Sequence, residues 1–167
     1  MKKILFTIAL ALLTGSVMAQ TPEEKAAAKA AKAALKEATK QANKKLSDGM
    51  ACATEVQTLY QAIQMEQQKG ESSNDKLIAE NEAKIQTVSL EGIELLTEAL
   101  STEYIKDSKK FQAYKALDDM ATMVLNSELV KASKKEPYNR EALASSIFAI
   151  TDACHGQLTW GKEEDQT

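Results

Sequence analysis

The sequence predicts an all-α protein, and three observations lead to that prediction. Apolar residues recur at helical spacing in five stretches of the chain. The chain is rich in Ala, Lys, Glu and Gln, which favour helices, and it contains only two prolines. We find no convincing run of alternating apolar and polar residues, the pattern of a half-buried strand. We therefore expect antiparallel helical hairpins, arranged either as a superhelix or as an irregular helical bundle.

Residues 1–19 have the features of a cleavable signal peptide. Two lysines precede an apolar run at residues 4–13, which is too short to span a bilayer comfortably. Val17-Met18-Ala19 offers suitable residues for signal peptidase, so we expect cleavage before Gln20 and export to the periplasm or beyond the cell. The alternative is an uncleaved anchor. A lipoprotein is not expected, because the first cysteine is Cys52.

The mature chain, residues 20–167, suits one domain with a real core. Without the two lysines of the signal it holds 19 basic and 24 acidic residues, a net charge of −5. This balance argues against nucleic acid as a partner, because such recognition usually shows a basic surface.

The first predicted helix covers residues 22–46, with Thr21 as its cap and Pro22 at its first position. Its apolar stripe is thin because it consists largely of alanine. We therefore expect residues 20–47 to form a weakly packed arm ahead of a helical domain at residues 48–161. One face of the arm is a candidate interaction surface: Lys29, Lys32, Lys36 and Lys40.

The next two helices are predicted at residues 50–69 and 75–100. The triplet at residues 47–49 is expected to interrupt or kink the first pattern, and Gly70 to end the second helix. Asn74 is expected to cap the third helix, in which Gly92 marks either a close helix crossing or a break. The second helix is expected to bury Cys52, Val56, Leu59, Tyr60 and Ile63.

The best-specified part of the sequence is residues 109–160, which we interpret as two amphipathic helices joined by a turn at residues 134–138. Ser108 is expected to cap the first of them, which runs to about residue 133 unless Asn126-Ser127 splits it. Asn139 is expected to cap the second, and residues 162–167 form a charged tail. The apolar stripes are Phe111, Tyr114, Leu117, Ala121, Val124, Leu125 and Leu129, then Leu143, Ile147, Ile150, Cys154 and Leu158.

Three segments carry a resemblance to a known family: residues 110–119 (KFQAYKALDD), 125–129 (LNSEL) and 137–139 (PYN). With the signal and the Ala/Lys-rich first helix, they resemble the N-terminal part of secreted tetratricopeptide-like helical-repeat proteins of Gram-negative bacteria. The resemblance implies helical hairpins that are used for protein–protein contact without catalysis. The tetratricopeptide consensus is not present at its spacing, so a compact irregular bundle is the alternative architecture.

Candidate catalytic chemistry is sparse. His155 is the only histidine, and Thr151 stands where haem attachment would need a second cysteine before Cys154. Asp118-Asp119 and the acids at residues 163–165 lack the spacing of a calcium loop. We find no phosphate-binding loop, nucleophile elbow or zinc-ligand pair. We therefore expect no enzyme, no cofactor and no bound metal.

Cys52 and Cys154 are the only cysteines, and they are a candidate disulfide in an oxidising compartment. The alternative is that both are small apolar core residues.

Charge is unevenly distributed along the chain. Residues 23–45 carry a net charge of +4, and residues 75–103 carry −5. These stretches are either ordinary solvated faces or surfaces that dock on each other, within one chain or in a weak homodimer.

The function expected from the sequence is a protein–protein interaction module with an unidentified protein partner. The candidate aromatic anchors are Tyr138, Phe148 and Trp160, each of which could instead be a core residue. The alternatives are a chaperone-like holdase of unfolded envelope proteins and a binder of membrane surfaces through the basic first helix.

Overall fold

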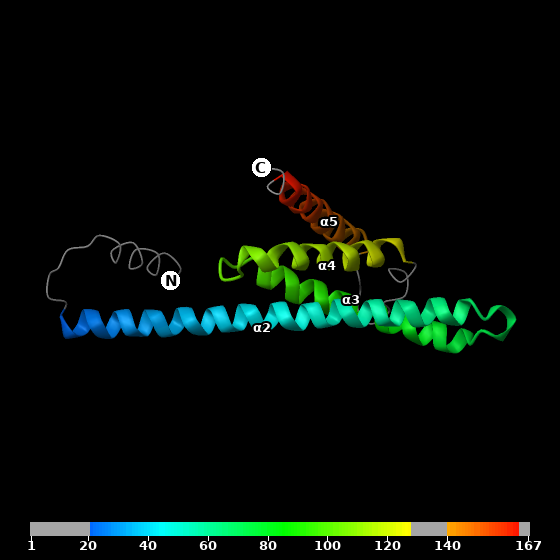
Figure 1. The fold of residues 1–167 in the computed structure, drawn as a ribbon, viewed down its shortest axis with the longest axis horizontal. Helices are drawn as coiled ribbons and strands as arrows, with labels where there is room; N and C mark the ends of the chain where they lie inside the picture. The colour runs from blue at the N-terminus through cyan, green and yellow to red at the C-terminus, as the bar shows by residue number, and fades with distance from the viewer. Residues whose placement is uncertain (1–20, 128–139, 164–167) are drawn as a thin grey trace. The chain divides into compact units, whose positions relative to one another are not determined.

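A computed structural model describes residues 21–127 and 140–163, and all regular structure within these ranges is helical. The prediction of an all-α fold is confirmed. The predicted signal peptide, the turn at residues 134–138 and Asn139 lie outside the described residues. The elements are α2 (Pro22–Gln67), a 3-10 turn η1 (Gly70–Ser72), α3 (Asp75–Leu100), α4 (Asp107–Asn126) and α5 (Arg140–Glu163), shown in Figure 1.

The chain divides into two compact units, Met1–Glu37 and Ala38–Thr167. The described part of the first unit is helical and largely exposed, and it begins with Pro22 at the first helical position, as predicted. The second unit begins before the domain boundary expected at residue 48, and it already buries Ala42 and Leu46.

The predicted interruption at residues 47–49 is wrong, because α2 runs unbroken from Pro22 to Gln67. Gly49 instead provides space for α3. A Cβ atom added at Gly49 would lie only 2.7 Å from Cγ of Leu96 and 3.2 Å from its backbone nitrogen. The missing side chain therefore allows two helices to approach closely, and α2 keeps its hydrogen-bonded backbone through this point.

Gly92 has the same role on α3. A Cβ atom added there would lie 2.8 Å from Cβ of Cys52 on α2 and 2.8 Å from Sδ of Met120 on α4. Since α3 is continuous, the expectation of a close crossing is confirmed and that of a break is not.

The turn between α2 and α3 follows the local sequence signals. Gly70 takes the left-handed conformation with φ of 58°, and the Asn74 side chain accepts a hydrogen bond of 3.1 Å from the backbone nitrogen of Leu77. Glu66 closes the turn, because it pairs with Lys69 and accepts a hydrogen bond of 3.2 Å from the backbone nitrogen of Asn74. The Lys69 hydrogen bond and then the Asn74 bond lower the pKa of the Glu66 carboxyl.

The predicted cap of the fourth helix is wrong. α4 begins at Asp107, its cap position is Lys106, and no side chain caps it. Asp107 instead forms an ion pair of 2.8 Å with Lys110, which lowers the pKa of the Asp107 carboxyl. At the other end α4 stops at Asn126, where the sequence analysis allowed a split, and the residues after Ser127 up to Asn139 lie outside the described residues.

The core of the second unit joins α2, α3, α4 and α5. Leu117 is 4% exposed and Leu96 is fully buried, while Ile147 and Cys154 bring α5 into the same core. The side chains that meet at the helix contacts are mostly small, since Ala99, Ala113 and Ala121 are also fully buried.

Two aromatic residues that were expected to be buried are exposed: Phe111 and Tyr60 are each 45% exposed. Phe111 lies six residues before Leu117, which at about 100° per residue places it about 120° away around the helix axis, so it leaves the buried face of α4. On α2 two series of buried positions repeat every seven residues: Ala42, Gly49, Val56 and Ile63 form one, and Leu46 and Ala53 form the other. Tyr60 continues the second series, seven residues after Ala53, but it is exposed, so this side of α2 is no longer covered at that point.

Candidate functional site

The lysines of the predicted basic surface are exposed to solvent. Lys29, Lys32 and Lys36 belong to the first compact unit, and Lys40 belongs to the second. Within the second unit, one ion pair joins the basic stretch to the acidic stretch: Lys45 of α2 pairs with Glu98 of α3. Both side chains are nearly half exposed, so this pair contributes at most about 1 kcal/mol.

Of the three candidate aromatic anchors, Phe148 is the one whose side chain is described. It is 68% exposed, so the alternative that it is a core residue is wrong. Tyr138 lies outside the described residues, and Trp160 lies on α5 with a side chain outside the description. Phe148 lines an open hollow of about 470 Å³ between α4 and α5, together with Leu125, Ala144, Ser145, Ala149 and Asp152.

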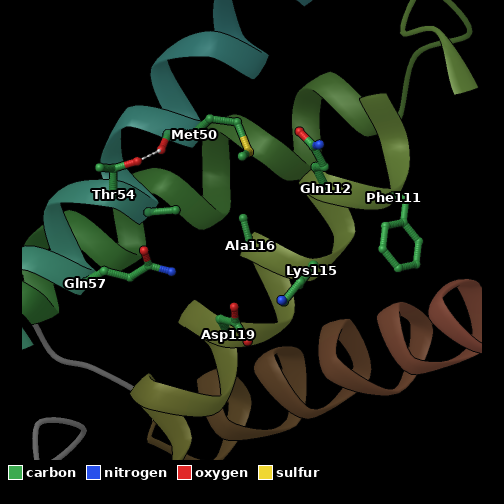
Figure 2. A pocket seen from close by; sticks show the side chains of 9 residues that line it. Met50, Thr54, Gln57, Phe111, Gln112, Lys115, Ala116 and Asp119 are labelled. Carbon is green, nitrogen blue, oxygen red and sulfur yellow. Dashed lines mark hydrogen bonds between the residues drawn. The ribbon is translucent and has the colours of Figure 1, made fainter. Parts of the chain in front are cut away.

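A second depression is a groove of about 230 Å³ between α2 and α4 (Figure 2). Each wall is one face of a helix over about two turns. On α2 the lining residues follow helical spacing, and on α4 they recur about every four residues. The lining residues are Met50, Ala53, Thr54 and Gln57 of α2 and Phe111, Gln112, Lys115, Ala116 and Asp119 of α4.

The groove combines a small apolar floor with a polar rim. Ala53 and Ala116 are buried and leave space between the helices, whereas Phe111 remains half exposed beside them. The exposed side chains of Gln57, Gln112, Lys115 and Asp119 offer both donors and acceptors. The Thr54 hydroxyl donates to the carbonyl oxygen of Met50 at 3.1 Å, as Figure 2 shows, so its proton is already engaged.

Sequence reasoning missed this groove. Phe111 was assigned to the buried stripe of its helix, and Gln57 and Gln112 carried no signal of their own. The one available clue was angular. Phe111 lies about 120° from Leu117 around the helix axis, too far to share a buried face with it.

The two cysteine thiols are free in the structure. Cys52 is half-buried beside Gly92, and Cys154 on α5 is only 1% exposed. Burial, followed by the charge of Glu91, raises the pKa of Cys52. Burial, followed by the charge of Asp118, raises the pKa of Cys154 to about 11. Both thiols are therefore poor nucleophiles near neutral pH.

Alkylation of native protein at about pH 8 should modify Cys154 at least ~10-fold more slowly than the same residue in urea-unfolded chain. The reason is that both its burial and its raised pKa keep it protonated and covered. The measurement is iodoacetamide labelling without reductant, quantified by peptide mass spectrometry, with Cys52 as the internal comparison. Equal rates in the native and unfolded chain would contradict the buried position. Labelling of both cysteines only after reduction would instead show the disulfide expected as one alternative.

His155 meets Asp118 across the contact between α5 and α4, with 3.1 Å between Nε2 and Oδ2. This pair brings together two residues that the sequence analysis considered separately. Within the described ranges, no group of three or more His, Cys, Asp or Glu residues is placed to hold a metal ion. None of the helices in the described ranges is both long and apolar enough to cross a membrane.

Comparison of the chain with protein-family models, with curated proteins and with solved structures finds no match.

Proposed function

We propose that this protein is a non-enzymatic interaction module whose α2–α4 groove binds a helical segment of a partner protein. The observation that carries the proposal is the groove itself, an apolar floor between two helices with a half-exposed phenylalanine at its side. Buried aromatic anchors contribute much of the binding energy of protein interfaces, and Phe111 is positioned to become one.

The shape of the groove supports a helix as the occupant. Gly92 of α3 contacts both α2 and α4, so these three helices already pack around one another. A further helix laid along the groove would contact a face of α2 and a face of α4, as neighbouring helices do in a helical bundle. Amphipathic helices that enter apolar grooves do so through residues at i, i+3, i+4 and i+7. Alanines at the floor permit close approach of the partner backbone.

The expected family function agrees with this proposal, because the tetratricopeptide-like resemblance implies protein–protein contact. The described helices are nevertheless longer than the two short helices of such a repeat, with 46 residues in α2 and 26 in α3. We therefore base the proposal on the groove rather than on a repeat architecture. Export through a signal peptide would place this contact in the periplasm or outside the cell.

The test is site-specific photo-crosslinking in the cells that produce the protein. A photoreactive phenylalanine analogue at Gln112 or Gln57, on the rim of the groove, should yield a defined crosslinked product. The same analogue at Thr87, an exposed residue of α3 that does not line the groove, should not. Phe111→Asp should remove the product, because it places a charge where an apolar contact is needed.

The matched control is Phe148→Asp, since Phe148 is another exposed phenylalanine but lies away from the groove. This variant should keep the crosslink, and thermal unfolding should show that both variants remain folded. A product that survives Phe111→Asp would refute the groove as the binding site. Crosslinking to many unrelated proteins in place of one product would favour the holdase alternative.

A further inference from the structure

We propose that His155 and Asp118 form a pH-sensitive latch that holds α5 against α4 more tightly at acidic than at neutral pH. The latch lies apart from the α2–α4 groove and does not depend on the function proposed for that groove. It would control the α4–α5 contact and therefore the shape of the hollow beside Phe148, whose lining comes entirely from these two helices.

The geometry of the pair is that of a contact between two helices. His155 lies on α5 and Asp118 on α4, 37 residues apart in the chain, with Nε2 and Oδ2 separated by 3.1 Å. Because the carboxylate is an acceptor when ionised, the ring nitrogen that faces it donates the proton. The Asp118 side chain is only 16% exposed, whereas the imidazole is 61% exposed and so can exchange protons with solvent.

Apart from the contact with His155, little in the described structure stabilises the negative charge of the Asp118 carboxylate. Its second oxygen, Oδ1, is buried and has no hydrogen-bond partner among the described residues. The charge of Asp118 is also felt by the buried thiol of Cys154, whose pKa it helps to raise. A half-buried carboxylate with one unpartnered oxygen is stabilised by a positive charge more than a fully solvated one would be.

His155 is the residue that can supply such a charge as the pH falls. It is the only histidine of the chain, and histidine is the side chain that normally changes charge between about pH 5 and 8. The other titratable or charged groups within one turn of the contact are Tyr114, Lys115 and Asp119 on α4 and Asp152 and Cys154 on α5. No ion pair joins any of them to Asp118 in the described structure, where the Asp118 partner is His155.

The charge on His155 sets the direction in which pH changes the strength of the α4–α5 contact. A protonated imidazole facing the Asp118 carboxylate forms a charge-assisted hydrogen bond, which is stronger than the bond that a neutral ring donates. Lowering the pH therefore favours the closed contact, and this advantage is lost as the pH rises. The imidazole is largely solvated, so the expected change in the opening equilibrium is modest, roughly two- to fivefold.

The test is hydrogen exchange of the full chain, measured by mass spectrometry at about pH 5.5 and about pH 7.5, on either side of the range where histidine titrates. Rates are corrected for the intrinsic pH dependence of exchange. Peptides from residues 142–159 should open roughly two- to fivefold less at the lower pH. Peptides from residues 75–100 of α3 report any change in the whole fold. His155→Gln, which keeps a neutral donor but cannot gain charge, should abolish the pH dependence of α5.

Asp118→Asn is the second variant. It removes the carboxylate that His155 faces, so it should also abolish the pH dependence of hydrogen exchange in α5. If this substitution unfolds the protein, His155→Gln still decides the matter, because His155 is mostly exposed. The proposal is overturned if α5 of the wild type shows no pH dependence beyond that of α3. It is equally overturned if His155→Gln retains the dependence of the wild type.

Discussion

Replacement of Leu117 by alanine should lower the free energy of unfolding by roughly 2–5 kcal/mol. Leu117 is 4% exposed on α4, within the core that joins α2, α3, α4 and α5. Removal of three buried carbon atoms loses their transfer free energy, and the cavity left behind adds a further loss. The close helix contacts at Gly49 and Gly92 leave little freedom for the helices to collapse into that cavity. The measurement is urea denaturation followed by circular dichroism.

The control for this prediction is Leu77→Ala. Leu77 is 36% exposed in the first turn of α3, and its structural role there is its backbone nitrogen, which the Asn74 cap binds. Since the backbone is unchanged, the loss should stay below about 1 kcal/mol. Equal losses for both leucines would mean that the core does not lie on the Leu117 face of α4.

Replacement of Gly92 by alanine should destabilise the protein, although alanine is the better helix former. Alanine gains about 1 kcal/mol in helix propensity over glycine. The new methyl group would lie 2.8 Å from Cβ of Cys52, an atom next to the backbone that cannot rotate away. The Met120 side chain, also at 2.8 Å, is flexible and can move. Overpacking costs about 1–3 kcal/mol, so we expect a small net loss for alanine and a larger one for Gly92→Val.

Gly156→Ala is the matched control, because Gly156 is also inside a helix but nothing lies within 4 Å of an added Cβ atom. This substitution should raise the free energy of unfolding by up to about 1 kcal/mol. The two glycines should therefore respond with opposite signs in the same denaturation experiment. A stabilising effect at both positions would show that α3 does not approach α2 as closely as the structure has it.

Local signals in the sequence were sufficient for α3. The bounds predicted for this helix, residues 75–100, are those observed, and the Asn74 cap and the Gly70 turn are present as predicted. Capping and left-handed turns depend on a few adjacent residues, so they can be read without knowledge of the fold. The core position of Leu117 was likewise evident from its helical spacing to Tyr114, Ala121 and Val124.

The candidate sites depended on contacts between distant residues, so the sequence indicated them poorly. Phe111 fitted the apolar stripe of its helix and Phe148 was a candidate anchor or core residue, but only packing shows that each is exposed beside a depression. His155 and Asp118 are 37 residues apart, and nothing in either local sequence indicates that α5 brings them within 3.1 Å.

What the sequence by itself determined is the helical class of the chain, the ends of α3 and the face of α4 that contains Leu117, because periodicity and capping are local properties. The tertiary structure alone decided the meaning of Gly49. In isolation a Ser-Asp-Gly triplet favours a break in the helix. In the fold, α2 continues through Gly49, and Leu96 can pack closely there because glycine has no side chain. The tertiary structure also decided which apolar side chains remain exposed, since their exposure depends on which helix packs against each face.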